Sequence, residues 1–237
     1  MAIPHLSWIQ AAQHALKQSH TLPTQHAHIT IRCQWVYDLP APQITQLQDM
    51  LTHAYDAGHS MWEYFEGNLT QRQNVLVFTL HAPGSAEILA TRSVGHTYWA
   101  DEYWSAHARH IGQNPPIAGA CFTVKRPHRD QGLASLLWHT STTWLKRHGI
   151  ASAIFGDTVS RRALAMYARK NAWLFLDDVR RICAAHGAGT FQEMLHSTRH
   201  AERIASEDGI RYVWPLADHT HEPFLHLGYC PAAQLPS

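Results

Sequence analysis

The chain has 237 residues, of which 45% are hydrophobic and 16% charged, and its formal net charge is +1 with the histidines neutral. This composition can bury a substantial core and excludes wholesale disorder, and so small a net charge argues against nucleic-acid binding through a general basic field. The length fits one large domain, and we expect a single domain over residues 1–237.

In the first half of the chain, residues 44–54 place apolar side chains at i, i+3 and i+4, which is typical of an amphipathic helix. A second helix is expected over 8–17, followed by a polar, histidine-bearing connection. β-branched and aromatic residues favour strands at 29–37, 74–81, 87–94 and 118–124. The remaining segments are a short helix or structured loop at 60–66, a hairpin turn at 82–85 and an aromatic, acidic loop at 96–113.

The second half alternates helices and strands. A helix is expected over 131–147, and Asp157, Thr158 or Ser160 can cap another that runs through Lys170. Strands are expected at 150–155, 172–176 and 211–216. Between the last two, the chain reads as helical from 178 to about 206, and the tail beyond 216 is loop-like. No internal repeat or low-complexity linker divides the chain.

The stretch from Cys121 to Ala134 carries the clearest chemistry. It begins as a β-prone run, turns through a basic segment and enters a helix at Gly132. A helix N-terminus presents unpaired N–H groups and a partial positive charge, and glycine lets a ligand approach the backbone closely. Arg129 can pair with phosphate oxygens. This stretch therefore predicts a site for a phosphate-bearing ligand.

Two spaced motifs give the stretch a more specific meaning. Residues 129–134, Arg-Asp-Gln-Gly-Leu-Ala, match the pattern (Arg/Gln)-x-x-Gly-x-(Gly/Ala). Ser160, Ala163 and Tyr167 hold the spacing of Asn-x-x-Ala-x-x-x-Tyr, with serine in the asparagine place. Over about residues 29–177, the chain resembles the GNAT superfamily of acyl-CoA-dependent N-acyltransferases. Residues 1–28 and 178–237 would be an N-terminal helical segment and a C-terminal extension of that core.

The resemblance implies an α/β (α+β) fold, in which a mixed, twisted central sheet is flanked by helices and splays open between its fourth and fifth strands. Acyl-CoA, most simply acetyl-CoA, would lie in that opening with its pyrophosphate on the 129–134 turn. The residues expected to contact it are Phe122, Thr123, Val124, Arg129, Asp130, Gln131, Gly132, Leu133, Ala134, Ser135, Ser160 and Tyr167.

Transfer of an acyl group from a thioester to an amine needs a neutral amine, a stabilised oxyanion and a protonated leaving thiolate. The resemblance places Tyr167 near the sulfur as general acid, and a backbone N–H around Phe122 could polarise the thioester carbonyl. The strand before the turn has no glutamate, so the base is open among Glu87, His96, Asp101 and Glu102, of which we favour Asp101 and Glu102. A covalent route through Cys121 is the less favoured alternative, because this thiol has no paired histidine in view.

Aromatic and acidic residues alternate in two segments that could reach the acceptor. Trp62, Glu63, Glu66 and Trp99 are the expected acceptor-binding residues, because such surfaces suit a cationic amine. The sequence thus predicts direct acetyl transfer to a small amine through a ternary complex. A protein or peptide acceptor, a longer acyl chain and a non-catalytic acyl-CoA-binding module stay open as alternatives.

The remaining expectations concern the cysteines, a metal site, the cellular location and the partners. The four cysteines lie far apart and are expected as buried thiols. Among the 20 histidines, the pairs His26/His28 and His219/His221 could ligate a metal, but no HExxH or Cys/His pattern occurs and we expect none. Neither a membrane span nor a secretory signal is visible, which predicts a soluble, cytoplasmic protein with no nucleic-acid or membrane partner; a homodimer stays open.

Overall fold

A computed structural model describes residues 5–24, 28–54, 61–95, 117–170, 172–204, 209–216, 224–225 and 228–235. The chain divides into two compact units, unit 1 (Met1–Ser152) and unit 2 (Ala153–Ser237). The single domain expected from the length depends on how these units associate and stays a prediction. Among the described residues, no helix is both long enough and apolar enough to cross a bilayer.

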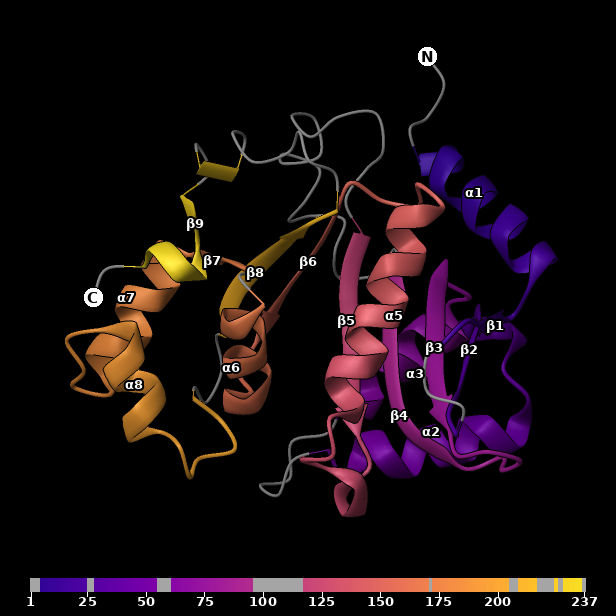
Figure 1. The fold of residues 1–237 in the computed structure, drawn as a ribbon, viewed down its shortest axis with the longest axis horizontal. Helices are drawn as coiled ribbons and strands as arrows, with labels where there is room; N and C mark the ends of the chain where they lie inside the picture. Colours follow the sequence, from indigo (N-terminus) through magenta and orange to yellow (C-terminus); the bar gives the residue numbers. More distant parts are fainter. Residues whose placement is uncertain are drawn as a thin grey trace. The chain divides into compact units, whose positions relative to one another are not determined.

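Unit 1 is built on an antiparallel sheet whose strands follow one another in chain order (Figure 1). The strands are β1 (Thr21–Leu22), β2 (Thr30–Trp35), β3 (Val75–His81), β4 (Ile88–Gly95) and β5 (Ile117–Val124). The helices are α1 (His5–Gln18), α2 (Ala41–Thr52), α3 (Trp62–Thr70) and α5 (Leu133–Arg147), with 3-10 turns η1 (Val36–Asp38) and η2 (Arg126–His128). The expected helices and strands of this half are confirmed, and β1 is a strand that the sequence pattern does not predict. The loop expected at 96–113 lies outside the described residues.

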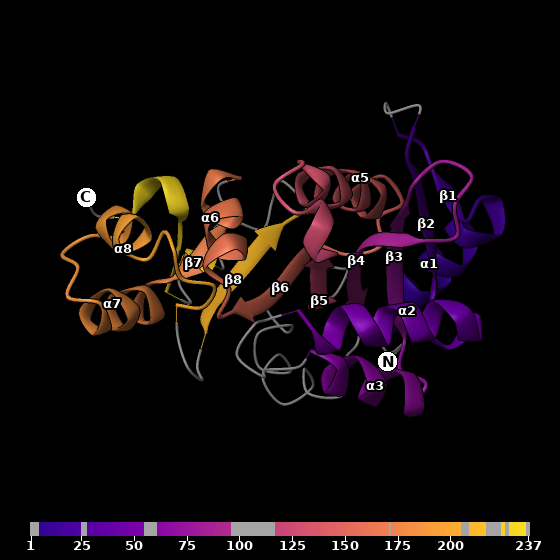
Figure 2. The same ribbon diagram turned by 90° about the horizontal axis from the view of Figure 1, so that it is seen from below.

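Helices cover both faces of this sheet. Figure 2 shows α5 on one face and α2 with α3 on the other. Every residue of β3 and β4 is buried, because both faces of these central strands are covered. On the α2–α3 side the core is formed by side chains such as Leu47, Leu51, Phe65, Val77 and Cys121. The sheet thus holds the end of β5 and the start of α5 on a rigid base.

Unit 2 contains a second run of antiparallel strands, in the order β6-β8-β7-β9. These are β6 (Ala153–Thr158), β7 (Trp173–Phe175), β8 (Ile210–Pro215) and β9 (Tyr229–Pro231). The helices are α6 (Arg161–Arg169), α7 (Leu176–Ala185) and α8 (Phe191–Ser197), and η3 (Ala232–Gln234) follows β9. Together the two units give the mixture of sheet and flanking helices that the fold class predicts.

Three sequence expectations for unit 2 are wrong. The single helical stretch from 178 to 206 is two helices, because Gly187 ends α7 in a left-handed conformation (φ +62°) and Thr190 starts α8 with a capping box to Glu193. The strand expected at 150–155 begins at Ala153. The tail is not all loop, since β9 pairs with β7 although it ends in proline.

An ion pair between buried Asp178 and half-buried Arg211 joins α7 to β8. Asp178 is 6% exposed and accepts hydrogen bonds from the Nε (2.7 Å), Nη2 (3.0 Å) and backbone N–H (3.0 Å) of Arg211. The guanidinium lies 3.8 Å from the centre of the Phe175 ring. These contacts satisfy a carboxylate that water cannot reach, so each partner depends on the other.

Replacing Asp178 with alanine should therefore destabilise the protein strongly. We expect a loss of about 1–3 kcal/mol in the free energy of unfolding, because the backbone N–H and the half-buried guanidinium of Arg211 would lose their charged acceptor. Asp177→Ala is the matched control: its pair with Arg180 is 73% exposed and should change stability by less than about 0.5 kcal/mol. Urea unfolding of both variants measures the difference, and equal small effects would contradict the role assigned to Asp178.

Candidate functional site

The turn between β5 and α5 has an unusual backbone. Asp130 and Gly132 both adopt positive φ, at +63° and +79°. Glycine adopts this conformation freely and aspartate tolerates it better than most residues. The chain therefore turns sharply at Gly132, which is the N-cap of α5.

The N-terminus of α5 has no side-chain cap. The first hydrogen bond within the helix runs from the Leu136 N–H to the Gly132 carbonyl (3.0 Å), so the N–H groups of residues 133–135 have no acceptor inside the helix. A Cβ placed on Gly132 would meet no atom within 4 Å, which shows that the space beside the turn is open. Open space, free donors and the positive end of a 15-residue helix suit an anion such as phosphate.

Arg129 braces this turn. Its Nε donates to the Val124 carbonyl (3.1 Å) and its Nη2 to the Ala54 carbonyl (2.8 Å), which ties the turn to the ends of β5 and α2. The structure thus adds a positioning role that the sequence reading did not foresee. Direct pairing of Arg129 with phosphate stays a prediction.

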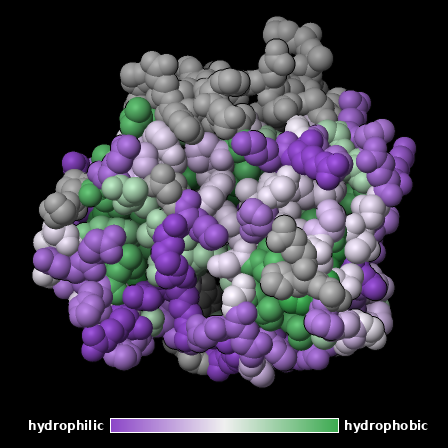
Figure 3. Space-filling view, viewed as in Figure 1, coloured by the Kyte–Doolittle hydropathy of each residue, from purple (hydrophilic) through white to green (hydrophobic). Residues whose placement is uncertain are grey.

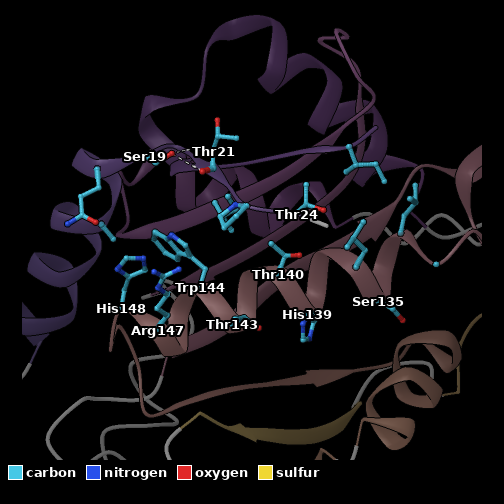
Figure 4. A pocket seen from close by; sticks show the side chains of 18 of the residues that line it. Ser19, Thr21, Thr24, Ser135, His139, Thr140, Thr143, Trp144, Arg147 and His148 are labelled. Atoms are coloured by element: carbon cyan, nitrogen blue, oxygen red, sulfur yellow. Dashed lines mark hydrogen bonds between the residues drawn. The ribbon is translucent and has the colours of Figure 1, made fainter. Parts of the chain in front are cut away.

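The turn lies at one end of a groove of about 700 Å³. α5 forms one wall, and the end of α1 with β1 and the residues after it forms the other (Figure 4). Four residues expected to bind the cofactor line it: Gln131, Gly132, Leu133 and Ser135. In Figure 3 hydrophobic side chains gather among hydrophilic ones over this face of unit 1. A volume of this size is typical of small-molecule sites.

The charge of the groove favours an anion as well. None of the described residues that line it is acidic, and Trp144, Arg147 and His148 gather at the end of α5 away from the turn (Figure 4). Burial, Arg147 and His14 lower the pKa of His148, so its ring stays neutral and Arg147 supplies the charge.

The strand before the turn contains an irregularity at Cys121. The pairing of β4 with β5 shifts between Arg92 and Val94, and the Ser93 hydroxyl accepts the Cys121 N–H at 2.9 Å. The N–H of Cys121 is thus engaged within the sheet. Farther along, Thr123 is buried and Phe122 and Val124 are half-buried, as strand residues expected to border a ligand.

The thiol of Cys121 belongs to the core. It is 1% exposed, and burial raises its pKa to about 12, although its hydrogen bond with Ser93 opposes the shift. Cys121 should therefore resist alkylation at pH ~8, reacting about 1,000-fold more slowly than an ordinary exposed thiol, because the thiolate is the reactive form. Mass spectrometry after iodoacetamide treatment of the native protein measures this, with half-buried Cys230 as the internal comparison. Rapid modification of Cys121 in the folded protein would restore the covalent alternative.

In unit 2, Ser160 and Tyr167 lie at opposite ends of α6. The Ser160 Oγ caps the helix by accepting the Ala163 N–H at 3.2 Å. Tyr167 is 3% exposed, and its hydroxyl donates to the Tyr212 hydroxyl at 3.4 Å, with the ring centres 4.4 Å apart. Tyr212 lies on β8, 45 residues away, and no local motif could have identified it.

Of the four candidates for the general base, the structure describes only Glu87. Glu87 forms an ion pair with Lys125 (2.5 Å), which lowers the pKa of its carboxyl and makes it a weaker base. His96, Asp101 and Glu102 lie outside the described residues, as does Trp99 of the expected acceptor site. The choice of Asp101 or Glu102 stays a prediction.

The other expected acceptor residues lie on α3. Glu63 and Glu66 are exposed and, three residues apart, share one helix face. Trp62 is half-buried and stacks on Phe65 with ring centres 5.7 Å apart. The two carboxylates thus face solvent, whereas the indole contributes to packing.

Histidines do not build a metal site in the part of the chain that the structure describes, where no group of three or more His, Cys, Asp or Glu side chains could hold an ion. His28 is exposed. Its neighbour His26 and the pair His219 and His221 lie outside the described residues.

No protein-family model and no curated protein matches the chain. Among solved structures, it is similar to a GNAT-family N-acetyltransferase from Escherichia coli in complex with CoA (16% identity, 88% of this chain, 98% of that chain, TM-score 0.48). It is also similar to the ribosomal-protein-S18-alanine N-acetyltransferase of Escherichia coli (13%, 81% and 99%, TM-score 0.44) and to an acyl-CoA N-acyltransferase from Pseudomonas aeruginosa (15%, 60% and 86%, TM-score 0.43). With identities and TM-scores this low, only the chain's own residues carry an argument about its chemistry.

Proposed function

We propose that the protein is an acyl-CoA-dependent N-acyltransferase of the GNAT superfamily, with acetyl-CoA as donor. The observation that carries the proposal is the 129–134 turn, where the motif residues Asp130 and Gly132 adopt positive φ and lead into an uncapped helix beside a groove. The turn offers backbone donors and open space to an anion, and the described lining of the groove contains no carboxylate that would repel it.

Each part of the donor would have its own partner in the chain. The N–H groups of residues 133–135 would hold the pyrophosphate, with Arg129 keeping the turn in place. Residues 122–124 of β5 would border the pantetheine. Since the N–H of Cys121 is bonded to Ser93, the donor that polarises the carbonyl would be the one that follows, at Phe122. Bound acyl-CoA supplies the thioester that is transferred.

Tyr167 would protonate the leaving thiolate. A phenol is a proton donor, and once Tyr167 has given its proton to the thiolate, the neighbouring Tyr212 hydroxyl could donate to the phenolate that remains. The proton that the amine loses on acylation, carried through solvent, would restore both hydroxyls. Burial of both rings limits the contact of this pair with bulk water.

A cationic amine is the acceptor class that α3 suits best, because Glu63 and Glu66 share an exposed face. Replacing both with glutamine should raise KM for a cationic amine by about 5- to 10-fold and leave KM for acetyl-CoA unchanged, as expected for two screened surface charges. Glu202→Gln, which removes one carboxylate from unit 2, serves as a control for net charge. Unchanged amine kinetics would remove α3 from the acceptor site.

The proposed activity is tested by release of free thiol from acetyl-CoA across a panel of polyamines, amino sugars, amino acids and peptides, with mass spectrometry of the acylated product. An acylated small amine supports the proposal. An acylated peptide would move the acceptor to the protein class, and binding of acetyl-CoA without turnover on any amine would favour the non-catalytic module.

A further inference from the structure

A second pocket lies within unit 2, between α6 and α8, and has a volume of about 600 Å³. Each helix turns one face toward it. From α6 come Arg161, Ala165, Ala168 and Arg169, and from α8 and the turn after it come Gln192, Leu195, His196 and Arg199. Both sets follow the three- and four-residue spacing of a helix face, and Ala232 and Ala233 of η3 complete the lining. Small alanine side chains leave the space that the arginines surround.

The lining is strongly basic. Among the described residues that line it, three are arginines, one is histidine and none is acidic. Hydrophilic side chains cover the face of unit 2 around α8 in the view of Figure 3. A cavity that gathers three guanidinium groups without a carboxylate raises the local concentration of anions.

Two of these arginines have N–H groups that are not engaged in hydrogen bonds among the described residues. Arg161 is anchored through Nη2 to the Leu195 carbonyl (2.7 Å), while its Nε is buried without a hydrogen-bond partner among the described residues. Arg169 is exposed and makes no hydrogen bond or ion pair within the described part of the chain. Arg199 contacts His196 (3.3 Å) and His200 (2.9 Å), which hold its side chain at the rim. Arg161 thus keeps one unsatisfied donor and Arg169 an uncommitted guanidinium, and an anionic ligand could accept hydrogen bonds from both.

We propose that this pocket binds a small molecule that carries a pyrophosphate group, of the nucleoside diphosphate class. Arginine pairs with phosphate oxygens in a bidentate manner, and the eight-residue step from Arg161 to Arg169 separates their backbones by roughly 12 Å along α6. Two anchors so far apart favour an extended anion over a single phosphate ion. The alanines and Leu195 offer apolar surface to the organic part of such a ligand. This site shares no residue with the α5 turn and does not depend on the acyltransferase proposal.

The test is calorimetric titration of the full chain with ADP and, in a second arm, with inorganic pyrophosphate. The double variant Arg169→Gln/Arg199→Gln should weaken ADP binding at least about tenfold, because each charged hydrogen bond contributes that much or more. Arg180→Gln is the matched control, since Arg180 is an exposed arginine of the same unit that does not line the pocket. It should leave the affinity within about twofold.

Because ADP is also part of CoA, the titration is repeated with Gly132→Val, which alters the α5 turn alone. ADP binding that persists in Gly132→Val and is lost in the double arginine variant supports the pocket in unit 2. The opposite pattern, or an absence of ADP binding to the unaltered protein, would overturn it. Pyrophosphate should bind several-fold more weakly than ADP, and equal affinity would overturn the nucleoside part of the assignment.

Discussion

Gly132→Val is expected to weaken acetyl-CoA binding by roughly 100-fold or more, equal to about 2.8 kcal/mol. The φ of +79° is unfavourable for a β-branched residue, and the added side chain would enter the open space in which the pyrophosphate is proposed to lie. Relief of the strain would also turn the N–H groups of α5 away from the ligand. Isothermal titration with acetyl-CoA measures the change directly.

Gly149→Val separates strain from ligand contact. Gly149 ends the same helix with φ +59°, and a Cβ there also meets no atom within 4 Å. Both variants should therefore lose a similar amount of stability, about 1–3 kcal/mol. Only Gly132→Val should lose acetyl-CoA, and equal loss of binding in both would mean that the turn acts through folding alone.

Tyr167→Phe is expected to lower kcat by about 100- to 10,000-fold, the range that general acid catalysis contributes. The substitution removes one hydroxyl and keeps the ring against Tyr212, so affinity for acetyl-CoA should stay within about twofold. Steady-state kinetics with a fixed amine, together with a binding titration, separates the two effects.

Two further tyrosine variants define the role of this hydroxyl. Tyr212→Phe should reduce turnover less than Tyr167→Phe, because Tyr212 acts through its neighbour. Tyr229→Phe removes a hydroxyl from another buried tyrosine of unit 2 and should leave turnover unchanged. A Tyr167→Phe variant with normal kcat would show that the proton reaches the thiolate from elsewhere.

Local signals in the sequence predicted most of the helices and strands. The strands that became β3, β4 and β5 are rich in β-branched and aromatic residues, and α5 begins where Gly132 follows the basic turn. The break between α7 and α8 was also readable, since Gly187 and the Thr190–Glu193 capping box are standard stop and start signals.

Other features depend on contacts between distant residues, which no local pattern records. The partner of Tyr167 is Tyr212 on β8, and β9 is a strand only because β7 provides its edge. Arg129 illustrates the same limit within a correctly predicted motif: the spacing identified the residue, but its hydrogen bond to the Ala54 carbonyl follows from the packing of α2 beside the turn.

The most direct test of the central claim is a calorimetric titration of the unaltered protein with acetyl-CoA. The α5 turn as a pyrophosphate site predicts saturable binding with a Kd between about 1 μM and 1 mM, the range in which enzymes usually hold their substrates, and loss of that binding in Gly132→Val. No binding at millimolar acetyl-CoA, or binding that Gly132→Val leaves unchanged, would contradict it.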